Sequence, residues 1–272
     1  GIFTINEYFT EKTARDIHKK YGKVDLITAS NVFAHADDLK GITEASFKIL
    51  KEGGHFIVEV QYLLDTLKDL TFDNIYHEHV NYWSVTSINN FFERLGLCVV
   101  DVEHVDTHGG SIRVYVQKGR DQINRSVQEF LTKEKDFGLL EFSTYEDFAK
   151  KIYERRKNVQ KNIKKLNERF NVIAGYAAPA KATTSLNFFG IDCNDIDYII
   201  EDNKLKNNKF VPGTEIEIKN KDFCNKNLPE LVIVLAWNFF NYIVENNLEL
   251  IDKNVKFINI KDLQNERFAD SI

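Results

Sequence analysis

The stretch KVDLITASNVFAHADDLKGITEASFKILKEGGHFIVEVQY, residues 23–62, decides the fold class. Its first part (23–35) is a short apolar run that leads into polar and aromatic residues, which predicts a buried strand followed by a turn. In residues 37–50 the apolar side chains recur at roughly helical spacing, and two glycines at 53 and 54 end this helix. HFIVEVQY (55–62) predicts another strand. A helix between two apolar strands is typical of a parallel sheet, so the sequence predicts an α/β fold.

The segments that follow fit the end of an open α/β domain. SVTSINNFFERLGL (84–97) predicts a capped helix that ends at Gly96. CVVDVEHV (98–105) and SIRVYVQK (111–118) predict two strands on either side of Gly109 and Gly110. We therefore expect a first domain over residues 1–118.

Residues 119–170 predict a helical linker. YEDFAKKIYERRKNVQKNIKKLNERF (145–170) places apolar side chains on one stripe, which indicates a long amphipathic helix joining two domains. Its lysines and arginines are interpreted as a solvated face. A second, smaller α/β domain is expected over residues 171–272, beginning with the strand and turn of NVIAGYAAPAK and containing a helix over 238–251 between its last two strands.

Composition excludes several classes of protein. Of the 272 residues, 43% are hydrophobic and 28% are charged, which is typical of a globular protein with two domains. The net charge of -5 does not favour a nucleic-acid polymer as partner. No apolar run approaches the ~20 residues that a membrane crossing needs, and no signal peptide is recognised, so we expect a cytoplasmic protein. The three cysteines have no CxxC spacing, which does not favour a zinc ribbon.

The stretch FDNIYHEHVNYWS (72–84) gathers titratable side chains and leaves three readings open. His77 and His79 have a spacing known from metal sites, but zinc needs three or four ligands and the sequence offers no convincing third one. A histidine can also remove a proton at neutral pH, with a nearby carboxylate such as Glu78 to hold its tautomer. The third reading is a structural cluster.

Three further segments carry candidate binding residues. Asn31 and His35 of NVFAH lie at the carboxyl end of a predicted strand, where open α/β sheets bind ligands, although Asn31 is equally explained as a cap. In THGGSIR (107–113) the glycines predict a tight turn, and His108 and Ser111 are contacts if that turn faces a ligand. In YAAPAK (176–181) a strand opens into a helix whose first amides, with Lys181, could hold a phosphate.

The order of these motifs is more informative than any single one. NVFAH, GGHFIVEVQY, FDNIYHEHVNYWS, HGGSIR, GYAAPAK, VPGTEIEI and LVIVLAWN together resemble the sugar C-methyltransferase family over nearly the whole chain. The resemblance implies an incomplete Rossmann-like methyltransferase sheet joined by a long helix to a smaller α/β domain. It further implies S-adenosylmethionine as methyl donor and deoxysugar biosynthesis as the process. The implied substrate is a nucleotide-linked keto-deoxysugar, methylated at a carbon beside its ketone through an enolate.

The resemblance also assigns roles to residues. It implies that His79 is the catalytic base, that Tyr76 and Glu78 are its polar neighbours, and that His35 completes the catalytic set. We also expect Asn31 to contact both substrate and donor. The remaining expected substrate contacts are His108, Ser111, Tyr176 and Lys181, of which the resemblance implies that Lys181 meets the nucleotide diphosphate.

The chain departs from the family pattern in its first residues. Relatives carry a cysteine-rich zinc-binding segment and then a glycine-rich loop for the methyl donor, and this sequence contains neither. We therefore expect an N-terminally truncated chain that binds the donor poorly, with zinc confined to the absent segment. Two alternatives stay open: a nucleotide-sugar binding module without methyl transfer, and a metal-dependent enzyme that uses His77 and His79.

Overall fold

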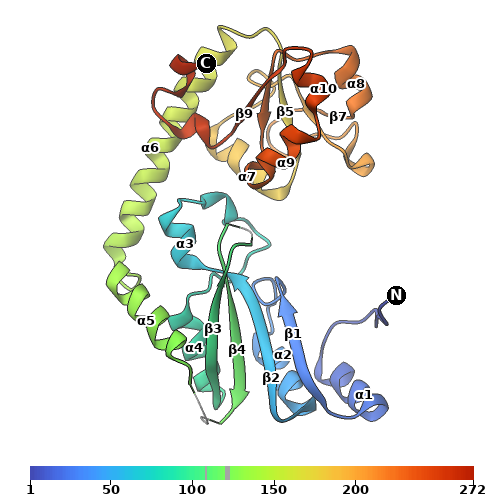
Figure 1. Cartoon of the computed structure of the whole chain (residues 1–272), viewed down its shortest axis with the longest axis vertical. Helices are drawn as coiled ribbons and strands as arrows, with labels where there is room; N and C mark the ends of the chain where they lie inside the picture. The colour runs from blue at the N-terminus through green and yellow to red at the C-terminus, as the bar shows by residue number, and fades with distance from the viewer. Residues whose placement is uncertain (108, 120–122) are drawn as a thin grey trace. The chain divides into compact units, whose positions relative to one another are not determined.

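The computed structural model describes residues 1–107, 109–119 and 123–272, and it divides into two units (Figure 1). Unit 1 comprises Gly1–Thr71 and His77–Tyr145, and unit 2 comprises Phe72–Tyr76 and Glu146–Ile272. Each unit is thus built from two separate stretches of the chain. The domain limits expected from the sequence stay a prediction.

The described residues of unit 1 form a four-stranded sheet in the order β1-β2-β4-β3. Its strands are β1 (Val24–Ser30), β2 (Leu50–Gln61), β3 (Leu97–Val105) and β4 (Ser111–Lys118). β1 and β2 run parallel, while β4 is antiparallel to both β2 and β3. The α/β fold predicted from residues 23–62 is confirmed. Because β3 runs in the same direction as β1 and β2, the carboxyl ends of all three strands lie at one edge of the sheet.

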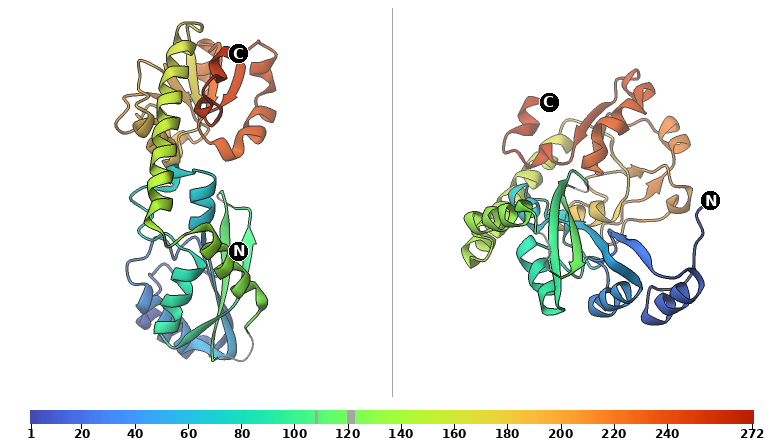
Figure 2. Two further views of the ribbon diagram at one scale, coloured as in Figure 1. Left: turned by 90° about the vertical axis from the view of Figure 1, so that its left-hand side faces the viewer. Right: turned by 60° about the horizontal axis from the view of Figure 1, so that its bottom comes forward.

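The core of unit 1 lies on one face of this sheet. Phe56, Val58 and Val60 of β2 are each 0% exposed, and alternate side chains such as Ile57 are only partly covered. Figure 2 shows helices along one side of the sheet in its right-hand view. The helices of unit 1 are α1 (Glu11–Tyr21), α2 (Leu39–Ile49), α3 (Leu63–Lys68), α4 (Val85–Arg94) and α5 (Arg125–Phe137). Burial of each large apolar side chain stabilises the unit by about 1.5–3 kcal/mol.

Helix α4 begins where the sequence predicts, because two sets of side chains accept hydrogen bonds from its first backbone N–H groups. Ser84 and Ser87 form a reciprocal cap. In addition, the buried carboxylate of Glu134 in α5 accepts hydrogen bonds from the N–H groups of Val85 at 2.6 Å and Thr86 at 2.8 Å. A carboxylate at this place also interacts favourably with the helix dipole. The cap therefore joins α4 to α5.

The segment expected to be one helical linker contains two helices. α5 ends at Gly138, whose φ of 76° lies in the left-handed region, and α6 (Phe142–Asn167) follows after a short turn. A left-handed residue cannot continue a right-handed helix, and glycine adopts it without strain. Along α6 the predicted apolar stripe is buried at Phe148, Val159 and Ile163. Among the described residues, no helix combines the length and the apolar composition that a membrane crossing requires.

The described residues of unit 2 form a five-stranded, fully parallel sheet in the order β7-β6-β5-β8-β9. The strands are β5 (Ile173–Tyr176), β6 (Tyr198–Ile200), β7 (Ile218–Lys219), β8 (Leu231–Val234) and β9 (Lys256–Asn259). The helices within unit 2 after α6 are α7 (Ala180–Phe189), α8 (Lys221–Lys226), α9 (Phe240–Glu245) and α10 (Leu248–Ile251), with short 3-10 turns at Phe72–Asn74, Lys204–Lys206, Trp237–Phe239, Asp262–Gln264 and Phe268–Ser271.

The single helix expected over residues 238–251 is broken between α9 and α10. Asn247 lies at the break with its side chain buried, and its amide donates to the carbonyl of Ile243 at 2.6 Å. A side-chain amide that bonds the local backbone competes with helical hydrogen bonds. The apolar periodicity continues through this position, which is why the pattern alone predicts one helix.

Candidate functional site

The carboxyl edge of the unit 1 sheet carries two loops that are joined to each other. The first follows β1, where Asn31 has a φ of 54° and donates its N–H to the carbonyl of Glu59 at 2.9 Å. The second contains His77, Glu78 and His79. The N–H groups of Val80 and Asn81 both donate to the carbonyl of Ala34, at 3.1 and 3.3 Å.

A cluster of aromatic side chains anchors both loops to the core. Phe33, which is 0% exposed, has its ring centroid 6.0 Å from that of Phe56 and 5.7 Å from that of Trp83. Phe91 and Phe92 of α4 complete the cluster around it. Aromatic pairs at these separations stabilise by about 0.5–1.5 kcal/mol beyond their buried area. The positions of His35 and His79 are thus held by packing on either side.

His35 and His79 lie together at this edge. Their ring centroids are 4.8 Å apart, with an angle of 48° between the ring planes. Nδ1 of His35 is 2.7 Å from the backbone carbonyl oxygen of Glu78. Because a carbonyl oxygen only accepts hydrogen bonds, Nδ1 of His35 carries the proton in this contact. His79 is buried, with 8% of its surface exposed, whereas His77 and Glu78 are exposed.

The loop between β3 and β4 is the third part of the same edge. Gly109 and Gly110 both have positive φ, at 89° and 104°, so the tight turn expected for this pair is formed. Ser111 is fully buried, and its hydroxyl donates to the carbonyl of Thr107 at 3.0 Å. Its assignment as a substrate contact stays a prediction, and His108 lies outside the described residues.

Side chains that the sequence did not single out hold this third loop. Asp65 of α3 contacts His104 of β3, with Oδ2 and Nε2 2.6 Å apart, and it also packs against Gly110. Glu59 forms an ion pair with Arg113 at 2.8 Å across β2 and β4. These contacts join residues far apart in sequence, so local patterns gave no signal for them.

In unit 2 the predicted residues occupy the carboxyl edge of the parallel sheet. Lys181 is in the first turn of α7, directly after β5, and its Nζ lies 5.4 Å from the ring centroid of Trp237. Burial lowers the pKa of Lys181, and the nearby carboxylate of Asp73 acts in the opposite direction. The indole of Trp237 donates to Asp73 at 2.6 Å. Trp237 belongs to the quoted LVIVLAWN motif, but neither it nor Asp73 was assigned a role.

Tyr176 and Tyr76 are the two predicted tyrosines of unit 2. Tyr176 is 2% exposed, and its hydroxyl donates to Asp202 at 3.0 Å, so the side chain is engaged inside the unit. Burial raises the pKa of Tyr176. Tyr76, although adjacent to His77 in sequence, belongs to unit 2 and is partly exposed. The proposed substrate contacts of both tyrosines stay predictions.

Comparison with known proteins decides the family. A family model described as the C-methyltransferase C-terminal domain matches residues 106–260, which is more than half of the chain. The chain belongs to the C-methyltransferase family. A model described as a methyltransferase domain matches residues 4–102 of the same chain. The chain is also similar to "C-methyltransferase NovU" of Streptomyces niveus, with 32% identity over 260 residues. That alignment covers 95% of this chain and 62% of the relative, so the chain spans less than two thirds of the relative's length.

The methyltransferase domain implies S-adenosylmethionine as the donor, but the described residues do not form a full cradle for it. In Rossmann-type sheets the nucleotide part of a ligand is held at the turn after the first strand and at the neighbouring strand ends. β1 pairs with β2 and, among the described residues, with no strand on its other edge. No residue of β1 is buried, and Leu26 is 52% exposed. Asn31, the one residue predicted to contact the donor, lies at this edge, and its contact with the donor stays a prediction.

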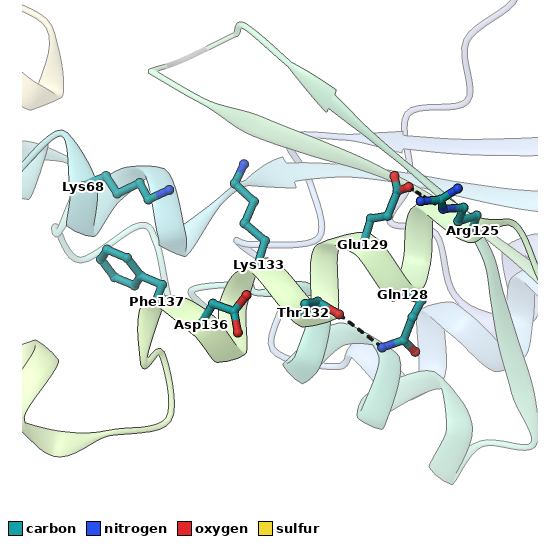
Figure 3. Close-up of a pocket in the computed structure, with 8 residues that line it drawn as sticks. All are labelled: Lys68, Arg125, Gln128, Glu129, Thr132, Lys133, Asp136 and Phe137. Carbon is teal, nitrogen blue, oxygen red and sulfur yellow. Dashed lines mark hydrogen bonds and ion pairs between the residues drawn. The ribbon is translucent and has the colours of Figure 1, made fainter.

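Within the described ranges, no group of three or more His, Cys, Asp or Glu side chains could hold a metal ion. A pocket of about 740 Å³ is an open groove in unit 1 between Lys68 of α3 and one face of α5 (Figure 3). Arg125 and Glu129 on its wall form an ion pair at 2.8 Å. None of the described candidate residues lines this groove, so it is not part of the candidate site.

Proposed function

We propose that the protein transfers a methyl group from S-adenosylmethionine to a carbon beside the ketone of a nucleotide-linked keto-deoxysugar. The observation that carries this proposal is the contact between His35 and His79 at the carboxyl edge of the unit 1 sheet. Membership of the C-methyltransferase family and similarity to a protein named C-methyltransferase support it. The nucleotide-linked sugar as substrate is what the resemblance of the sequence motifs to the sugar C-methyltransferase family implies.

In the proposed reaction His79 acts as the base. A hydrogen on the carbon next to a ketone is acidic enough for a positioned imidazole to remove it. The electron pair of that C–H bond moves into the enolate, and the proton goes to the ring nitrogen of His79. The carbon so activated would take the methyl group of bound S-adenosylmethionine, whose S–CH3 bond would break with the electron pair left on sulfur, so that S-adenosylhomocysteine would be the leaving group. Hydrogen bonds to the enolate oxygen lower the barrier, and the hydroxyl of Tyr76 is the proposed donor.

His35 is proposed to position the base. Its Nδ1–H bond to the carbonyl of Glu78 holds the residue immediately before His79. The two hydrogen bonds to Ala34 hold the residues immediately after it. A catalytic group fixed from both sides loses little freedom in the transition state, which favours the reaction.

The test uses exchange of substrate hydrogen with solvent. In deuterated water, a base that forms the enolate replaces the hydrogen beside the ketone by deuterium, and no methyl donor is needed. We expect this chain to catalyse the exchange, and we expect His79→Asn to slow it by roughly 10²–10⁴-fold. His77→Asn is the matched control and should keep the wild-type rate, since His77 is exposed and is assigned no role.

The exchange experiment distinguishes an enzyme that forms an enolate from a module that only binds the sugar. If His79→Asn exchanged deuterium at the wild-type rate, His79 would not be the base. Binding of the nucleotide-linked sugar with no exchange by the wild-type chain would favour a binding module. Mass spectrometry of the recovered sugar measures the incorporated deuterium directly.

A further inference from the structure

The start of α3 lies between two loops of unit 1 and is joined to both by its backbone. The N–H of Tyr62 donates to the carbonyl of Gly110, in the loop between β3 and β4, at 3.1 Å. The next N–H, that of Leu63, donates at 2.8 Å to the carbonyl of Trp83, at the end of the loop that carries His79. Two consecutive residues therefore connect the loop of the proposed base to the loop after β3.

Asp65, in the first turn of α3, reaches from this helix to the end of β3. Its Oδ2 lies 2.6 Å from Nε2 of His104, and its side chain is 13% exposed. A hydrogen bond to an ionised carboxylate is roughly twice as strong as one between neutral groups. The contact between Asp65 and His104 therefore ties α3 to β3 through side chains, in addition to the main-chain bond from Tyr62.

Gly110 leaves the space that Asp65 needs to reach His104. A Cβ at Gly110 would lie 2.3 Å from Oδ2 of Asp65, so a side chain at this position would displace the carboxylate. The φ of Gly110 is 104°, a conformation that glycine adopts without strain. The carboxylate thus packs directly against the loop, at the residue before Ser111.

The loop is held separately on its other side. Oγ1 of Thr107 lies 3.5 Å from Oε1 of Glu59, and the carboxylate of Glu59 forms the ion pair with Arg113. The carbonyl of Thr107 also accepts the N–H of Gly110 at 3.0 Å. Loss of the Asp65 contact would therefore loosen the loop relative to α3 and leave these other bonds in place.

We propose that Asp65 and His104 are positioning residues, which hold the loop between β3 and β4 in its substrate-binding position relative to the loop of His79. The proposal rests on the proposed function, because it takes His79 as the base and the loop at Ser111 as a contact of the sugar. A binding loop that is already ordered in the free protein costs less free energy to bind with. Neither Asp65 nor His104 was singled out by the sequence motifs.

The experiment measures deuterium exchange into a thymidine diphosphate-linked keto-deoxyhexose and separates KM from kcat. We expect Asp65→Ala and His104→Ala each to raise KM by about threefold to tenfold, because the loop then has to be ordered when the sugar binds. The kcat of exchange should stay within about twofold of the wild type, because His35 and the backbone still hold His79.

Two further variants test whether the carboxylate–imidazole contact is responsible. In Asp65→Asn the amide can still form a hydrogen bond with Nε2 of His104, so KM should stay within about twofold of the wild type. Asp106→Ala is the matched control, because its carboxylate lies 3.4 Å from Nδ1 of the same ring but its side chain is 99% exposed. Exposed ion pairs contribute little, so this variant should also keep KM within about twofold.

The double variant Asp65→Ala/His104→Ala tests whether the two side chains act as one pair. We expect its KM to equal that of either single variant, because the same contact is lost in all three. An unchanged KM in both single variants, an equal rise in Asp106→Ala, or multiplied effects in the double variant would overturn the proposal.

Failure of this proposal and failure of the proposed function give different results. If the wild-type chain catalysed no exchange, the proposed function would fall and this inference with it. Exchange by the wild type with an unchanged KM in both single variants removes only the roles of Asp65 and His104. Circular dichroism melting curves confirm that each variant is folded, and His104→Ala keeps the test decisive if Asp65→Ala is unfolded, because the imidazole is 37% exposed.

Discussion

The imidazole rings of His35 and His79 lie 4.8 Å apart, and the peptide carbonyl of Glu78 accepts a hydrogen bond from Nδ1 of His35. His35 lies in the loop after β1, and His79 lies in the loop before α4. Hydrogen bonds from the N–H groups of Val80 and Asn81 to the carbonyl of Ala34 join these two loops. The imidazole of His79, which we propose as the base, is therefore held by the ring of His35 and by the backbone on both sides.

His35 can be tested with two replacements that differ in one donor. His35→Ala removes the bond to Glu78, and we expect deuterium exchange into the substrate to slow by about 10–100-fold because His79 is less well positioned. In His35→Asn the side-chain amide takes the place of the Nδ1–H donor, so it should retain more activity than alanine. Equal losses in both variants would contradict a positioning role and indicate that Nε2 of His35 takes part in the chemistry.

Gly110 should be less replaceable than another glycine of positive φ. Gly96 has a φ of 72° and open space where a Cβ would lie, so Gly96→Ala should cost about 1 kcal/mol of unfolding free energy from backbone strain alone. At Gly110, with a φ of 104°, a Cβ would also collide with the Asp65 carboxylate that bonds His104. We expect Gly110→Ala to cost about 1–3 kcal/mol more than Gly96→Ala. Urea unfolding measures both, and equal costs would argue against the Asp65 contact.

Glu134 should be one of the most sensitive polar positions of unit 1. Glu134→Ala leaves the N–H groups of Val85 and Thr86 without their acceptor inside the protein, which should cost about 2–4 kcal/mol. Glu129→Ala removes an exposed carboxylate from the same helix and should stay within about 0.5 kcal/mol of the wild type. In a Trp237→Phe background, the fluorescence of Trp83 reports unfolding of unit 1. A small effect of Glu134→Ala would mean that the Ser84 cap suffices for α4.

We expect protonation of the Glu201 carboxylate to lower the free energy of unfolding at acidic pH. Burial raises the pKa of this carboxyl, but hydrogen bonds from the N–H groups of Asn203 and Ala178 and the charge of Lys206 outweigh it, so the pKa lies below its ordinary value of 4.5. The stabilisation is therefore fully present above pH 4.5 and is lost as the pH falls through the lower folded-state pKa.

The comparison is between wild type and Glu201→Gln, in a Trp83→Phe background where Trp237 reports unit 2. The free-energy advantage of the wild type at pH 7 should shrink below pH 4.5. Glu245→Gln, at an exposed carboxylate of α9, controls for the general effect of removing a negative charge. An advantage that stays constant down to pH 3 would show that Glu201 is not the group responsible.

This chain should bind S-adenosylmethionine weakly. β1 has no buried residue and, within the described residues, pairs on one edge only, so few backbone groups are available to hold the donor. Titration calorimetry with S-adenosylmethionine should therefore show no micromolar binding. S-Adenosylhomocysteine is a suitable second ligand, because it lacks the sulfonium charge and separates electrostatic attraction from shape. Micromolar affinity for either would contradict this interpretation of the β1 edge.

The order of strands and helices was predictable where local patterns decide it. The two apolar runs predicted the strands β1 and β2, and the helical spacing between them predicted α2. Ser84 indicated the start of α4. Within the expected linker α5 was not singled out, whereas the long helix expected over 145–170 corresponds to α6. The break at Asn247 between α9 and α10 was missed, because the hydrogen bond from its side chain to Ile243 forms only in the folded chain.

The candidate residues were predictable as chemical types but not as neighbours. His35 and His79 were named from motifs, yet their contact depends on how two loops pack around Phe33. The pairing of Asp73 with Trp237 joins a 3-10 turn to the end of β8, and no local pattern connects them. Such pairs need the tertiary fold, because the hydrogen bond forms only after the strands have been assembled.

The short segment Phe72–Tyr76 belongs to unit 2 but lies in the sequence between the two stretches of unit 1, so neither unit can be expressed as one uninterrupted piece of the chain. A polypeptide that begins at Glu146 would contain the parallel sheet, but Phe188 and Phe189 would lose the ring of Phe72. Trp237 would lose its acceptor as well. A complete unit 2 therefore requires that the five residues Phe72–Tyr76 be fused to the fragment that begins at Glu146, or be added to it as a peptide.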